Sequence, residues 1–106
     1  MGSPMSTLTF ENDPERHRYE AYADGVLAGY SEYNLLSDSI VFTHTEVLPE
    51  HEGKGIGSYI AREALADARK QAKYVVPVCT FIAAYLRKHR EDADLVIPDV
   101  QAAFRI

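Results

Sequence analysis

The chain has 106 residues, of which 46% are hydrophobic and 25% are charged, and its formal net charge is −5. This length favours one globular domain with a core of its own, and no apolar run reaches the roughly 20 residues that a membrane-spanning helix needs. A negative chain whose one basic cluster is residues 87–90 argues against duplex nucleic acid as the main partner.

Cysteine usage and the ends of the sequence give further expectations. The single cysteine, Cys79, excludes an intramolecular disulfide, which favours a reducing cytoplasm. The first residues lack the charged-then-apolar pattern of a signal peptide. Residues 1–6 are predicted to be a disordered start or a cloning scar, residues 7–98 a single domain, and residues 99–106 a tail of uncertain structure.

The first half of the chain predicts an antiparallel meander. A short strand at residues 8–10 precedes a turn signature at 11–14, and a second strand covers 18–23. The dipeptide Asp24-Gly25 is a strong hairpin signal, after which a strand at 26–33 returns. A turn at 35–39 leads into a β-branched strand at 40–47.

The second half predicts an alternation of helix and strand. A helix over residues 55–72 carries one apolar stripe, at Ile56, Ile60, Ala64, Leu65 and Ala68. A short buried strand at 74–78 is expected to pair in parallel with the strand at 40–47, because a crossover helix joins them. A second helix over 80–89 and a last strand at 95–97 complete the expected elements.

The most informative stretch joins the fourth strand to the first helix. Gly53, Gly55 and Gly57 leave backbone amides uncovered just before a helix start, where N–H groups lack helical partners and the helix dipole is positive. Such a turn predicts an anion site for a phosphate or diphosphate.

Other interpretations of this turn fit less well. A P-loop requires a Gly-Lys pair followed directly by a hydroxyl residue, whereas here Lys54 is followed by Gly55. A dinucleotide fingerprint requires an acidic residue about 20 positions further on, where the chain reads Lys73 to Pro77 without an acid. A structural turn that binds nothing is the simplest alternative.

Two segments resemble the GNAT acetyltransferases. Val47-Leu48-Pro49 followed by residues 52–57 resembles their acyl-CoA motif, [QR]-x-x-G-x-[GA], and residues 77–89 resemble a branch of small single-domain GNAT-like proteins. The resemblance implies an α/β (α+β) fold with a mixed sheet, in which antiparallel strands precede a helix, a parallel strand and a second helix. The pair of helices that larger members insert after the first strand is missing, which implies an open acceptor groove.

The resemblance also implies the ligands. The donor is acetyl-CoA, and the acceptor is an unidentified amine on a small molecule, a protein lysine or an N-terminus; no metal is predicted. Glu52 departs from the motif, because it stands where the superfamily usually has Gln or Arg, and a carboxylate repels a diphosphate. The residues expected to bind the coenzyme are Val47, Leu48, Glu52, Gly53, Lys54, Gly55, Ile56, Gly57 and Ser58.

Acetyl transfer requires a polarised carbonyl, an amine that loses a proton and a thiolate that gains one. In GNAT enzymes a backbone N–H polarises the carbonyl, here near Val47 or Leu48. His44 and Glu46 are the candidate bases, because residues two apart on a strand share a face and histidine titrates near neutral pH. The alternative for this pair is a solvated or structural role.

Two further residues are catalytic candidates. Tyr85 matches the tyrosine that many GNAT enzymes use to protonate the thiolate, although it also fits a core stripe. Cys79 precedes a helix start, a position that favours a thiolate, so it is a candidate transient acetyl acceptor or a residue that lines the sulfur channel. A small buried hydrophobic residue is its simplest interpretation. A CoA-binding or sensor module without transfer activity is the alternative function.

Overall fold

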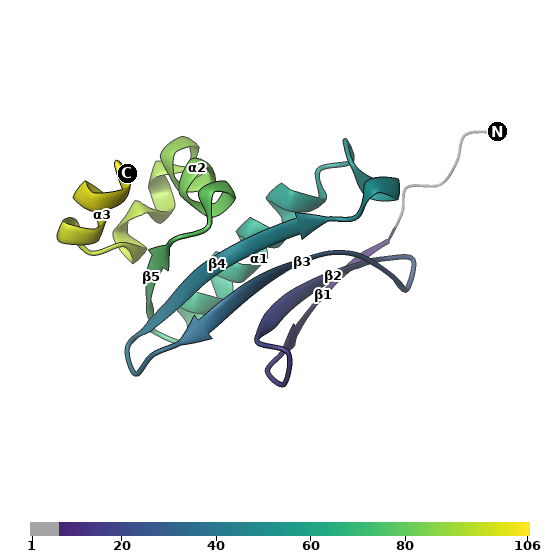
Figure 1. Cartoon of the computed structure of the whole chain (residues 1–106), viewed down its shortest axis with the longest axis horizontal. Helices are drawn as coiled ribbons and strands as arrows, with labels where there is room; N and C mark the ends of the chain where they lie inside the picture. Colours follow the sequence, from purple (N-terminus) through teal and green to yellow (C-terminus); the bar gives the residue numbers. More distant parts are fainter. Residues whose placement is uncertain (1–6) are drawn as a thin grey trace.

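The computed structural model describes residues 7–106, and in this range it shows one five-stranded sheet and a layer of helices (Figure 1). The sheet has the strand order β1-β2-β3-β4-β5. Its strands are β1 (Leu8–Asp13), β2 (Arg18–Ala23), β3 (Val26–Leu35), β4 (Ser39–Val47) and β5 (Tyr74–Pro77). The helices are the 3₁₀ turns η1 (Pro49–His51) and η2 (Arg90–Leu95) and the α-helices α1 (Ile56–Lys70), α2 (Thr80–Lys88) and α3 (Pro98–Phe104).

The sheet is mixed, as the sequence predicts. β1 to β4 form an antiparallel meander, and the β2–β3 turn falls at Asp24-Gly25, where both residues have positive φ angles. β5 pairs in parallel with the first half of β4, because α1 carries the chain back across the sheet. The predicted fold class and the predicted parallel pair are both confirmed.

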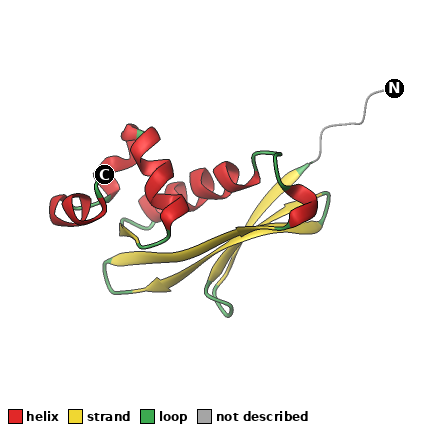
Figure 2. Cartoon of the chain, turned by 45° about the horizontal axis from the view of Figure 1, so that its top comes forward, coloured by secondary structure: helices red, strands yellow, loops and turns green. Residues whose placement is uncertain are grey.

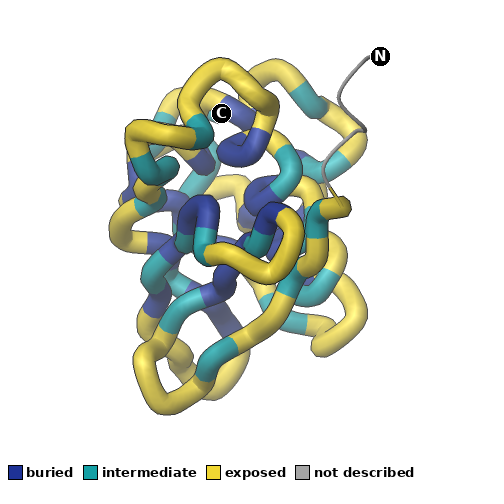
Figure 3. Tube along the Cα trace, turned by 90° about the vertical axis from the view of Figure 1, so that its right-hand side faces the viewer, coloured by how far each residue is buried: buried dark blue, intermediate teal, exposed yellow. Residues whose placement is uncertain are grey.

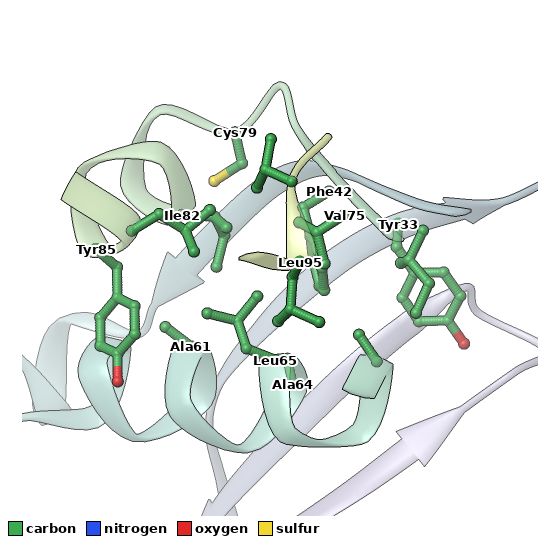
Figure 4. Close-up of a cluster of buried hydrophobic side chains, with 14 of the residues drawn as sticks. Tyr33, Phe42, Ala61, Ala64, Leu65, Val75, Cys79, Ile82, Tyr85 and Leu95 are labelled. Carbon is green, nitrogen blue, oxygen red and sulfur yellow. The ribbon is translucent and has the colours of Figure 1, made fainter. Parts of the chain in front are cut away.

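The helices α1 and α2 lie over one face of this sheet, and the described chain leaves the other face bare (Figure 2). The core lies between the two layers, where buried segments gather inside and exposed ones lie at the periphery (Figure 3). The predicted stripe of α1 is buried, and it packs with α2 over the strands (Figure 4). The residues from α1 in the main cluster are Ala61, Ala64, Leu65 and Ala68.

The C-terminal part differs from the expectation. The predicted strand at 95–97 does not form, because Leu95 and Val96 are both buried at the end of η2, which removes the alternation that a strand needs. Pro98 then begins α3, a position where proline's missing N–H costs nothing. Residues 99–106, expected to be a tail, belong to α3 and its end, and Val100 and Ile106 pack against the core.

Smaller differences concern boundaries. β1 continues to Asp13, beyond the predicted residues 8–10, and the chain turns over Pro14–His17 directly into β2. No helix is inserted between these two strands, in agreement with the sequence. The expectation of a disordered start or cloning scar concerns residues 1–6, which lie outside the described residues. None of the helices in residues 7–106 is long and apolar enough to cross a membrane.

Candidate functional site

The strands β4 and β5 separate halfway along β4. Their parallel pairing ends at Phe42 and Pro77, and the last link is the Cys79 N–H, which donates to the Phe42 carbonyl at 2.7 Å. Residues 43–47 of β4 continue beyond this point without a partner on β5. The two strands therefore splay apart beyond this point, and we call the region beside the unpaired edge of β4, at residues 43–47, the cleft.

Backbone groups of this edge point into the cleft. The Leu48 N–H donates to the Ala28 carbonyl of β3 at 2.9 Å. Because backbone groups alternate in direction along an antiparallel strand, the N–H groups of Val47 and Thr45 point away from β3, toward the side that β5 has left. Of the two amides named from the sequence, that of Leu48 is thus already bonded and that of Val47 faces the cleft.

A β-bulge controls which side chains of β4 face the helices. The β3–β4 register steps from His44 directly to Phe42, so Thr43 has no partner on β3. An extra residue in one strand reverses the alternation of side chains beyond it. Thr45, rather than His44, therefore continues the helix-covered face on which Phe42 lies.

The Thr45 hydroxyl connects the sheet to the beginning of α2. Its Oγ1 lies 2.9 Å from the Ser31 Oγ, and it accepts a hydrogen bond from the Cys79 Sγ at 3.3 Å. Ser31 and Cys79 are both buried. The Cys79 thiol thus lies inside the helix layer, at the point where β4 and β5 separate.

His44 and Glu46 lie together on the opposite, bare face of the sheet. The His44 Nε2 is 2.8 Å from a Glu46 carboxylate oxygen, and the two side chains are 53% and 45% exposed. The Tyr30 ring lies beside His44 with ring centroids 6.5 Å apart. This pair can exchange a proton with a molecule that approaches from the bare face, beside the edge of the cleft.

The glycine turn lies at the far end of the cleft, before α1. Gly53 and Gly55 have φ angles of +79° and +77°, and a Cβ on either would point into open space. No side chain caps α1, and within residues 7–106 the backbone N–H groups of 53–58 have no hydrogen-bond acceptor. The turn therefore presents free amides at the positive end of a 15-residue helix.

These amides border an open hollow of about 280 Å³. Phe81 of α2 closes one side, and its ring lies so close to Gly57 that a Cβ there would come within 2.7 Å of the ring. A side chain at position 57 would therefore have to displace the Phe81 ring. The hollow is lined by Val47, His51, Glu52, Gly53, Gly55, Ile56, Gly57, Ser58 and Phe81.

Tyr85 lies apart from the other catalytic candidates. Its side chain lines a smaller hollow of about 100 Å³, which shares the lining residues Ser58 and Phe81 with the first hollow. The Tyr85 ring stacks on the His89 ring, with the two ring centroids 3.9 Å apart. A tyrosine phenol is protonated at neutral pH, and burial, with a smaller contribution from the negative charge of Asp92, raises the pKa of the Tyr85 phenol further. Figure 4 shows this hydroxyl beside α1, away from Cys79.

The structure thus distributes the four predicted catalytic residues over three places: the bare face, the sheet opening and the hollow beside α1. Sequence reasoning missed the hydroxyls of Thr45 and Ser31, because their approach depends on the bulge at Thr43. His51 is also absent from the residues predicted to bind the coenzyme, whereas the structure places it in the lining of the hollow. Its position two residues before the first glycine was the available signal.

A family model described as GCN5-related N-acetyl-transferase matches residues 18–95, from the beginning of β2 to the end of η2. The matched segment includes the sheet opening, the glycine turn and the helices beside them. The chain belongs to this family. The match confirms the family that the sequence resemblance indicated. A comparison with curated proteins found no match.

Membership of the GCN5-related N-acetyltransferase (GNAT) family supports acetyl transfer as the general class of activity. The structure also fits a coenzyme by its own features. The turn presents free backbone amides, and no side chain covers them at Gly53 and Gly55. The adjoining edge of β4 presents further backbone groups that are not paired with β5.

Gly55→Val tests the turn as a coenzyme site in this GNAT protein. A β-branched residue at φ +77° is strained, so we expect the free energy of unfolding to fall by about 1–3 kcal/mol. We also expect the CoA dissociation constant to rise by about tenfold or more, because the amides turn away from the hollow. Calorimetry with CoA and a thermal melt measure the two effects.

Gly25→Val is the matched control. Gly25 has nearly the same φ, +82°, and equally open surroundings, but it lies in the β2–β3 turn, outside the glycine turn. We expect a similar loss of stability and unchanged CoA affinity. An equal loss of affinity in both variants would show that strain, and not the turn, controls binding.

Proposed function

We propose that this protein is an acetyl-CoA-dependent N-acetyltransferase whose amine acceptor enters from the bare face of the sheet. One observation carries the proposal: the cleft between β4 and β5 lies beside the strand that leads to the glycine turn, and unpaired backbone N–H groups lie along this path at Thr45, at Val47 and at residues 53–58. A diphosphate at the turn and an extended chain along β4 would use all of them.

Each part of the path has a separate task. The amides of residues 53–58 and the dipole of α1 bind the diphosphate. The free edge of β4 orients the extended arm of the coenzyme by backbone hydrogen bonds, as an added strand would. When bound, acetyl-CoA supplies an activated acetyl group as a thioester.

The residues around the β4 edge would carry the chemistry. The Val47 N–H donates to the acetyl carbonyl oxygen and stabilises the negative charge that develops there. His44, oriented by Glu46, accepts a proton from the acceptor amine. The protonated phenol of Tyr85 is proposed as the donor to the departing thiolate, and its hollow adjoins the coenzyme hollow.

The direction of the acceptor follows from what covers the sheet. The helices lie on one side of the sheet, and β1 turns directly into β2, so the described chain leaves the other face bare (Figure 2). His44 is half exposed on this face. This arrangement favours an acceptor that reaches the cleft edge from an open surface, such as an amine on a polyamine, a peptide or a protein.

Two measurements test the proposal. Calorimetry should show binding of acetyl-CoA and CoA but not of NAD. An assay with polyamines, peptides and lysine-rich proteins should then show acetyl transfer to an amine. Binding without transfer to any acceptor would favour a CoA-binding or sensor module, and no binding of acetyl-CoA would contradict both functions.

Cys79 is proposed to have a packing role at the point where β4 and β5 separate, rather than to accept the acetyl group. Its thiol donates to the neutral Thr45 hydroxyl, and the described residues place no basic side chain in hydrogen-bond contact with it. We therefore expect mass spectrometry of the protein with acetyl-CoA to show no acetyl adduct on Cys79. An adduct that forms in the native protein and not in Cys79→Ala would show that the thiol is acetylated first.

A further inference from the structure

His51 has an unusual environment within the coenzyme hollow. Its Nδ1 is the one side-chain nitrogen or oxygen atom of residues 7–106 that is shut off from solvent without a hydrogen-bond partner. The residue belongs to η1, where its own N–H donates to the Leu48 carbonyl at 2.9 Å, and its side chain lines the hollow. A partnerless enclosed nitrogen lowers stability, so it requires a reason.

The charges of the hollow supply that reason. Its lining contains the carboxylate of Glu52 but no lysine or arginine. A diphosphate placed against the free amides would therefore meet a repelling carboxylate. His51 is the lining residue whose side chain can carry positive charge, and Ser58 is the other lining residue with a side-chain donor.

We propose that His51 binds the diphosphate of coenzyme A through its imidazole ring, and so offsets the charge of Glu52. The proposal rests on the proposed function, because it assigns a residue to the same coenzyme site. Rotation of the ring about its side-chain bonds brings Nδ1 from its enclosed position to the hollow. The hydrogen bond that Nδ1 lacks in the free protein is then made to a phosphate oxygen.

This role separates the effects on stability and on binding. If Nδ1 makes its hydrogen bond only to a bound ligand, then replacing His51 by phenylalanine removes an unsatisfied nitrogen from the free protein and keeps a flat ring. The free protein should then melt at the same or a higher temperature, although it binds CoA less well. A residue with only a structural role would lose stability on the same substitution.

The test compares the native protein with His51→Phe and His51→Asn by calorimetry and thermal melting. A hydrogen bond to a charged group predicts a loss of CoA affinity of about 10- to 100-fold in His51→Phe. The loss should be equal for dephospho-CoA, which keeps the diphosphate but lacks the 3′-phosphate. The amide of His51→Asn retains a donor near Nδ1, so this variant should bind CoA more tightly than His51→Phe.

Each other outcome has a definite meaning. Unchanged CoA affinity in His51→Phe overturns the proposal, as does a loss for CoA that is missing for dephospho-CoA, because the contact is then with the 3′-phosphate. A lower melting temperature with equal losses in both variants shows a structural role and overturns it as well. If the native protein binds no CoA, the proposed function itself fails.

Discussion

Replacing Val47 by proline is expected to lower the rate of acetyl transfer by about 100- to 1,000-fold while the protein remains folded. Proline has no N–H, so the substitution removes the donor proposed to polarise the acetyl carbonyl. The sheet should tolerate it, because the Val47 amide faces the cleft where β5 has left β4. Proline is accepted at such edges.

Leu48→Pro is the matched control. It places a proline at the neighbouring residue, but it should lower the stability and not the transfer rate. The backbone of Leu48 has φ −67°, which suits proline, but its N–H donates to the Ala28 carbonyl. This control should lose about 1 kcal/mol of stability and retain transfer activity. The comparison uses the melting temperature and the single-turnover rate of each variant. Equal rates in the two variants would exclude the Val47 amide from the reaction.

His44→Gln is expected to lower the maximal transfer rate by about 100- to 10,000-fold, because glutamine cannot accept the proton of the amine. The dissociation constant of acetyl-CoA should not change, since His44 lies on the bare face and outside the lining of the coenzyme hollow. Steady-state kinetics at saturating acetyl-CoA, with calorimetry alongside, separate the two effects.

Glu46→Gln and Glu32→Gln extend this test. Glu46 bonds to His44 at 2.8 Å, so its loss should also lower the rate, whereas Glu32 pairs with His44 across the strands without a side-chain bond to it. Glu32→Gln should therefore leave the rate nearly unchanged. A full rate in His44→Gln would remove the pair from catalysis and leave the amine to lose its proton to water.

Much of the fold could be predicted from the sequence, because its signals are local. The Asp24-Gly25 turn and the apolar stripe of α1 each act through a few neighbouring residues, and the parallel pairing of β5 follows from the crossover. The region after α2 could not be predicted. There, burial of Leu95 and Val96 against the core decides the conformation. The apolar run at residues 95–97 is equally compatible with a strand, so the sequence does not distinguish the two.

In the candidate site, the free amides of the glycine turn could be predicted from the sequence, but the placement of the candidate catalytic residues could not. The glycine turn depends on backbone freedom and on a helix start, which a linear motif records. The face on which His44 lies depends on the bulge at Thr43, which reverses the alternation, and no residue in 40–47 signals it. For the same reason the contact of Thr45 with Cys79 joins residues 34 positions apart that no spacing rule connects.

The tight turn from β1 to β2 has a consequence for selectivity. An enzyme that encloses its acceptor selects by size, because a large molecule does not fit into the site. An open sheet face does not exclude a large molecule in this way. Discrimination must then come from how far an amine protrudes from its carrier and how closely the carrier's contour matches the platform. The proposed enzyme would thus choose among acceptors by the shape of the body that presents the amine.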